Sequence, residues 1–186
     1  MSLRWERMTD EKRSGLFRSV AADFDHPLEM LAACHDRIEE RCELLHRLSQ
    51  HMRDAGADAQ AQQAAANVIR YFDTAGENHH RDEEEDLFPR LLAADRAACE
   101  ALVGRLLEDH REMRKAWTRM RETLSRIAAG ESASLDADEV GRFTSLYRRH
   151  IELEEDHLLP AAERLLDTSA LADTGDAMAK RRGAPR

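Results

Sequence analysis

The side chains best suited to chemistry in this sequence are histidines and glutamates that recur at helical spacing. Of the four pairs with the order His-xxx-Glu, two lie within apolar stripes, and a helix places residues four positions apart on the same face. Two further histidines, His35 and His110, occupy positions where the three- and four-residue pattern of apolar residues along a helix would place an apolar side chain. Together these give six candidate metal ligands: His35, His79, Glu83, His110, His150 and Glu154.

Four imidazoles and two carboxylates are too many donors for one tetrahedral zinc ion. They suit two ions of intermediate hardness, with four terminal imidazoles and with Glu83 and Glu154 each bridging both ions. An added oxo or hydroxo bridge would leave one octahedral position open on each ion for O2, NO or peroxide. We therefore predict two iron ions with an oxo or hydroxo bridge, with manganese or a mixed pair as the alternative.

Four long amphipathic segments must position these ligands. Apolar residues recur at three- and four-residue spacing around each ligand, strong helix formers dominate and β-branched residues are scarce. Breaks fall at 54–58, at Asp95 and at 130–134, where Gly56 suits a helix C-terminus and Asp136 an N-cap. Because short connections make neighbouring helices antiparallel, we predict an all-α fold, an antiparallel up-down-up-down four-helix bundle.

The positions of the turns predict that the four ligand histidines lie at about one level of the bundle. The first two ligand histidines are centred on position 57, the last two on position 130 and the middle two on about position 95. The order His, then His-xxx-Glu, also occurs twice, each time followed by a proline at the same offset, Pro89 and Pro160. This predicts a pseudo-twofold repeat of two αα-hairpins, with a kink at each proline.

Composition limits the class of protein. The 186 residues, 42% of them apolar, allow one domain with a substantial core. The net charge of -9 argues against nucleic acid as a partner, and no apolar run approaches the ~20 residues that span a bilayer. The charged start lacks the apolar core of a signal peptide, so we expect a cytoplasmic protein with no membrane partner. Three cysteines without a CxxC pair indicate reduced thiols: Cys34, Cys42 and Cys99.

The chain divides into a bundle and two ends. We predict a polar leader at 1–23, the four-helix bundle at 24–167 and a basic flexible tail at 168–186. The basic residues of that tail are expected to be solvated: Lys180, Arg181, Arg182 and Arg186.

Residues 79–89 read His-His-Arg-Asp-Glu-Glu-Glu-Asp-Leu-Phe-Pro, which resembles the signature of the hemerythrin-like, HHE cation-binding family. The resemblance covers about 24–167 and implies the same six ligands around a carboxylate-bridged di-iron centre. Oxygen-carrying hemerythrins use five histidines, three of them on one iron, whereas four are in register here. This set is more similar to that of the relatives implicated in nitrosative stress and in repair of iron–sulfur clusters.

The other histidines fall outside the predicted site. His157 lies two turns from His150, about 10 Å along the helix axis, which is too far for the same cluster. Four histidines off the apolar stripes are expected at the surface or behind the ligands: His26, His46, His51 and His80. Four large side chains within two turns of the ligands are predicted to line a pocket: Phe72, Met113, Trp117 and Tyr147.

The predicted function is that of a non-haem di-iron protein. It would bind or sense O2 or NO, or handle peroxide or iron in oxidative or nitrosative stress, with an electron-donor protein as a further candidate partner. No general acid or nucleophile is evident beyond the ligands, which favours a sensor, carrier or stress protein over a classical enzyme. Two alternatives remain: a metal-free helical adaptor or regulatory module with structural histidines, and a ferritin-like di-iron redox protein that uses Glu77-xx-His80 and Glu154-xx-His157.

Overall fold

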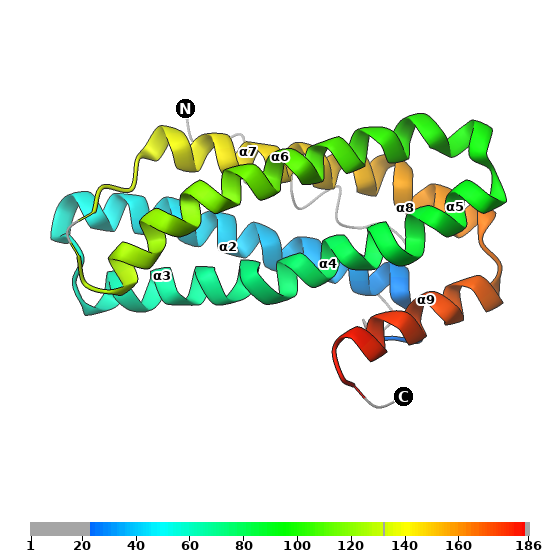
Figure 1. Cartoon of the computed structure of the whole chain (residues 1–186), viewed down its shortest axis with the longest axis horizontal. Helices are drawn as coiled ribbons and strands as arrows, with labels where there is room; N and C mark the ends of the chain where they lie inside the picture. Colours follow the sequence, from blue (N-terminus) through cyan, green and yellow to red (C-terminus); the bar gives the residue numbers. More distant parts are fainter. Residues whose placement is uncertain (1–22, 132, 185–186) are drawn as a thin grey trace, which may run out of the picture.

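Four helical rods form an antiparallel bundle in the computed structural model, which describes residues 23–131 and 133–184 (Figure 1). The first rod is α2 (Pro27–Ala55), and the second runs through α3 (Ala59–Tyr71), η1 (Phe72–Gly76), α4 (Glu77–Arg81), η2 (Asp82–Leu87) and α5 (Phe88–Ala94). The third rod is α6 (Arg96–Ala128), and the fourth comprises α7 (Ala137–Leu153), η3 (Glu154–Leu158) and α8 (Leu159–Leu165). A shorter helix, α9 (Thr168–Arg181), follows. The described residues include no strand, so the predicted all-α bundle is confirmed.

The turns between rods form where the sequence predicts them. Gly56 and Gly130 have positive φ values of 73° and 77°, a conformation that side chains with a Cβ rarely adopt. Asp95 accepts a hydrogen bond from the backbone N–H of Ala98, and Asp136 accepts one from that of Asp138, so both cap the helices that follow them. Since each rod then packs against its two neighbours, α2 contacts α3 and α7, and α6 contacts the same two helices.

Two apolar clusters fill the bundle, one on each side of a polar layer. One cluster lies toward the 57 and 130 turns and includes Leu45, Val68, Leu124 and Phe143. The other lies toward the 95 turn and includes Leu31, Leu91, Leu106 and Leu158. In the first three rods the predicted ligands fall between the residues of the two clusters, and in the fourth they lie between Tyr147 of the first cluster and Leu158 of the second. The ligand layer is therefore covered by apolar side chains on both sides. The four side chains expected to line a pocket belong to the first cluster: Phe72, Met113, Trp117 and Tyr147.

The predicted flexible tail is wrong, because residues 168–181 form helix α9. Asp167 caps this helix through the N–H of Ala170, and Met178 is completely buried against the bundle. Figure 1 shows α9, coloured orange to red, turning back from the end of α8 toward α4 and α2, and its contacts are with η2 and α2. Burial of one apolar face and pairing of its basic residues hold the helix in place. The predicted leader falls almost wholly on residues 1–22, outside the described residues.

The basic residues of α9 pair with a buried acid instead of facing water. Asp82 in η2 has no solvent exposure, and both Arg181 and Arg182 donate hydrogen bonds to its carboxylate, the latter over 2.6 Å. Arg181 also donates to Asp86 over 2.7 Å and to Glu85 over 2.9 Å. A buried carboxylate requires such partners, and these two arginines supply them. None of the described helices is long and apolar enough to cross a membrane.

Candidate metal centre

The six predicted ligands meet in the polar layer, where none of them is more than 1% exposed. Each rod contributes at least one imidazole, and the two glutamates lie in the π-helical segments η2 and η3. The predicted register is therefore correct, since side chains from four separate rods come together at one level. The six residues are His35, His79, Glu83, His110, His150 and Glu154.

Glu83 presents one carboxylate oxygen to each hairpin of the bundle. Its Oε1 lies 3.3 Å from Nε2 of His79, in the same rod, and its Oε2 lies 3.3 Å from Nε2 of His110 in α6. The two oxygens of one carboxylate thus have different imidazole neighbours. This is the arrangement that a carboxylate shared between two ions requires.

Glu154 repeats this arrangement from the other hairpin. Its Oε1 lies 2.9 Å from Nε2 of His150 in the same rod, and its Oε2 lies 3.1 Å from Nε2 of His35 in α2. The donors therefore fall into two groups of four, each within 4.8 Å, that share the glutamates. The first half-site contains His35 and His79, and the second half-site contains His110 and His150. Each hairpin supplies both imidazoles of one half-site.

The spacing of these donors is compatible with a shared metal ion. Metal–nitrogen and metal–oxygen bonds of about 2.1 Å at right angles place neighbouring donors about 3.0 Å apart. The four imidazole–carboxylate distances, from 2.9 to 3.3 Å, match that separation. Nε2 of His110 also lies 3.0 Å from Nε2 of His150.

Unpartnered polar atoms are concentrated in this layer. Within the described residues, eight of the nine buried side-chain nitrogens and oxygens without a hydrogen-bond partner belong to this layer or to His80. They include both oxygens of Glu154 and both ring nitrogens of His79. Several lie close to one another without the geometry of a hydrogen bond. Because an unsatisfied buried polar group costs about 1–3 kcal/mol, such a set indicates a ligand that satisfies all of them at once.

Two further carboxylates fix the orientation of two imidazoles. Glu84 lies 2.6 Å from Nδ1 of His110, and Glu155 lies 3.2 Å from Nδ1 of His35. A proton on Nδ1 that is donated to a carboxylate leaves the lone pair of Nε2 directed at the centre, as in most histidine-bound metal sites. Arg114 in turn donates to Glu84 over 2.9 Å. Each supporting glutamate directly follows a shared glutamate in the sequence and bonds to a histidine of the other hairpin.

The pKa values reflect how much charge is buried in this layer. Burial lowers the pKa of His35, but the neighbouring carboxylates of Glu154 and Glu155 outweigh burial and raise that pKa to about 10. His110 behaves similarly, with burial opposed by Glu83 and Glu84 and a pKa raised to about 9. Burial, reinforced by the neighbouring imidazole of His35, holds the pKa of His79 well below its usual range.

The two shared glutamates differ in the direction of their pKa shifts. Burial and the nearby charge of Glu154 raise the pKa of Glu83 to about 7. Burial also acts on Glu154, yet His150 and His35 outweigh it and hold the pKa of Glu154 well below its usual range. A bound cation would take the place of the protons that this layer otherwise holds, so metal binding should release protons.

Proline explains why the glutamates lie on π-helical turns. Pro89 and Pro160 have no N–H to donate to the carbonyl four residues earlier. In both rods the preceding residue instead bonds five residues back, Phe88 to the carbonyl of Glu83 and Leu159 to that of Glu154. The expected kinks thus take the form of π-turns that begin at the ligands, and such turns are frequent at functional sites.

His80 is one of the histidines expected at the surface or behind the ligands, and the structure places it behind them. It is only 3% exposed, and its ring stacks on that of His110 with centroids 4.2 Å apart. The pattern of apolar residues could not reveal that His80 is buried, because that pattern marks only one face of the helix and His80 lies beside this face. The sequence does contain a signal for Glu84 and Glu155, namely that both His-xxx-Glu motifs continue as His-xxx-Glu-Glu.

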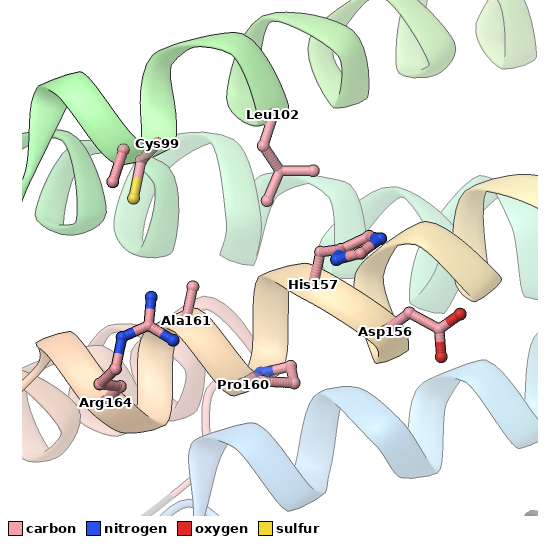
Figure 2. Close-up of a pocket in the computed structure, with 8 residues that line it drawn as sticks. Cys99, Leu102, Asp156, His157, Pro160, Ala161 and Arg164 are labelled. Atoms are coloured by element: carbon pink, nitrogen blue, oxygen red, sulfur yellow. The ribbon is translucent and has the colours of Figure 1, made fainter.

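The residues proposed for a ferritin-like site do not come together. Glu77 is 45% exposed and pairs with Arg114 at the surface. His157 lines a surface pocket between α6 and the fourth rod, whose lining also includes Cys99 and Arg164 (Figure 2). None of the six predicted ligands lines this pocket. The three cysteines are all buried and unpaired, as expected for reduced thiols.

Comparison with known proteins agrees with this geometry. A protein of Haemophilus influenzae named "Uncharacterized protein" is 28% identical over 161 residues, covering 87% of this chain and 92% of the relative. Residues 26–162 match the sequence model of the hemerythrin HHE cation binding domain, and this range contains all six predicted ligands. With a buried histidine–glutamate cluster in the bundle that this family implies, the chain belongs to the hemerythrin HHE cation-binding family.

Proposed function

We propose that the chain holds two iron ions in a carboxylate-bridged centre and uses them to bind or sense O2 or NO, or to handle peroxide or iron under oxidative or nitrosative stress. The observation that supports two ions is the division of oxygens within each shared glutamate. Glu83 and Glu154 each have one oxygen in each half-site, within 3.3 Å of an imidazole nitrogen on both sides. One ion could not use both oxygens in this way.

The donor set favours iron. Imidazole suits zinc, copper, iron and nickel, while carboxylate suits harder ions such as manganese, and iron accepts the mixture. Two iron ions placed here would supply redox chemistry and an open coordination position for a small ligand. Manganese, or a mixed pair, is the alternative metal content.

The chain's own residues would hold and shield the ions. Glu84 and Glu155 keep the Nδ1 protons of His110 and His35 away from the centre, so that both rings offer Nε2. The two apolar clusters cover the ligand layer on both sides along the axis of the bundle. They would leave room only for small molecules to reach the ions. A small diatomic ligand is therefore the kind of partner that this layer can admit without opening the bundle.

Metal content and an absorption spectrum test the proposal directly. Protein purified in air without an affinity tag should contain about two irons per chain and show charge-transfer bands of oxo-bridged ferric iron. Chelation of the metal should lower the melting temperature, because the ions stabilise the folded state. A chain that contains no iron, takes none up under anaerobic conditions and melts at the same temperature with and without chelator would instead be a metal-free helical module.

A further inference from the structure

Helix α9 is bonded to the turn that carries one of the two shared glutamates. Asp82 directly precedes Glu83 in η2 and has no solvent exposure. Arg182 donates to both carboxylate oxygens of Asp82, over 3.1 Å to Oδ1 and over 2.6 Å to Oδ2, and Arg181 also donates to Oδ1. Arg181 reaches Asp86, near the other end of η2, over 2.7 Å. The two arginines therefore bind η2 on both sides of Glu83.

The two arginines are themselves held in place by the packing of α9. Met178 is completely buried in the second apolar cluster, and Ala179 is buried beside it in the sequence. The guanidinium of Arg182 donates back to the carbonyl of Met178 over 3.1 Å, and that of Arg181 is only 9% exposed. Because α9 contacts both η2 and α2, it lies across the two rods that carry the first half-site.

The rotation of η2 about its axis decides where the carboxylate of Glu83 lies. Successive residues on a helix point about 100° apart, so Asp82 can face α9 while Glu83 faces the ligand layer. A side chain ends about 5–6 Å from the helix axis, so rotation of the turn by about 10° moves its end by about 1 Å. Functional side chains have to be held within about 0.5 Å of their productive positions. Since a π-turn interrupts the regular hydrogen bonds of the helix at this point, bonds from outside the rod fix that rotation.

The equivalent turn of the fourth rod has no such acids. Alignment of His150 with His79 places Leu153 at the position of Asp82, and it places a histidine at the position of Asp86. The repeat thus accepts an apolar residue where η2 has a buried carboxylate. Because a buried ion pair often stabilises a fold no more than apolar residues of similar size, stability alone does not explain Asp82. Helix α9 also lies beyond residues 26–162, the range that matches the family domain.

We propose that Arg181 and Arg182 are positioning residues for Glu83, an inference that rests on the proposed function. They act through Asp82 and hold η2 at the rotation at which the carboxylate of Glu83 lies between the two half-sites. Helix α9 is then part of the metal centre without providing a ligand. It supports the carboxylate bridge of Glu83 and not that of Glu154.

Replacement of Arg182 by alanine tests this role, because Arg181 still pairs with Asp82 and the buried carboxylate keeps a partner. D82L is a second variant that removes the buried charge and copies the residue that the fourth rod accommodates, so it keeps the test open if R182A does not fold. The control is L124A, a large-to-small change in the first cluster that lowers stability about 21 Å along α6 from His110. All four proteins would be titrated anaerobically with Fe(II) against a competing chelator, at a temperature at which circular dichroism shows them folded.

Wild-type protein and L124A should bind two Fe(II) per chain with the same affinity. R182A and D82L should bind Fe(II) about 10-fold more weakly, the lower end of the 10- to 100-fold loss seen for residues that support ligands, because they act on Glu83 through the backbone. Wild-type affinity in either variant would overturn the positioning role and leave the di-iron centre intact. An equal loss in L124A would show that affinity follows stability and would overturn that role as well. Absence of Fe(II) binding by the wild-type protein would instead overturn the proposed function.

Discussion

Replacement of Arg181 by alanine should destabilise the four-helix bundle, although Arg181 lies in α9, after the four rods. Its partner Asp82 is part of the second rod. The guanidinium is 9% exposed and bonds to Asp82, which has no exposure, and to Asp86. Removing one partner of a buried ion pair costs about 3–5 kcal/mol. Because Arg182 continues to bond to Asp82, we expect a smaller loss of stability, about 2–3 kcal/mol.

Urea unfolding of the chelator-treated protein measures this loss without a contribution from bound metal. For a domain of this size, 2–3 kcal/mol corresponds to a fall in melting temperature of roughly 4–12 °C. The control is Arg96→Ala, whose guanidinium is 66% exposed and pairs with Glu100 at the surface. It should change stability by less than about 0.5 kcal/mol.

A double-mutant cycle identifies the cause of the loss. Asp82→Asn removes the buried charge, so in that background Arg181→Ala should cost clearly less than in the wild-type protein, because only the pairs of Arg181 with Asp86 and Glu85 still contribute as ion pairs. The reasoning is refuted if Arg181→Ala is no more destabilising than Arg96→Ala, or if its cost is unchanged when Asp82 is neutral.

Two further predictions concern the metal layer. Glu83→Ala should release both irons, whereas Glu84→Gln should weaken iron binding by about 10- to 100-fold, since Glu84 only orients His110; metal analysis after dialysis checks both, and full iron occupancy in Glu83→Ala would disprove the bridge. The chelator-treated protein should lose stability as the pH rises from about 7 to 10. The pKa values of His35 and His110 are about 10 and 9 in the folded state against about 6.5 in the unfolded state, so the folded state binds more protons in this range. Urea titrations at several pH values test the sign, and stability that increases with pH would contradict it.

Most of the bundle and its ligand layer could be predicted because local rules and global packing agree there. Gly56 and Gly130 mark turns that need positive φ, and equal distances from those turns fix the level of the histidines. A polar residue within an apolar stripe then identifies a ligand. Each step uses periodicity or turn chemistry, which a single sequence contains.

What could not be predicted depends on contacts between distant segments. Arg181 and Arg182 look like solvated charges until Asp82, about a hundred residues earlier, is seen to be buried and in need of partners. His80 lies off the stripe of its own rod, and only the position of α6 shows that it points inward. The sequence places these residues on helices, but the angle at which neighbouring rods meet decides what they contact.

The crossing of Glu84 to His110 and of Glu155 to His35 bears on how such a chain could originate. Each hairpin holds the imidazoles of one half-site yet borrows a carboxylate oxygen and a supporting glutamate from the other hairpin. A single ancestral hairpin could complete this centre only by dimerising around a twofold axis. Duplication and fusion of its gene would give the present order of helices, and later divergence of the two copies would leave a histidine at position 80 opposite an isoleucine at 151.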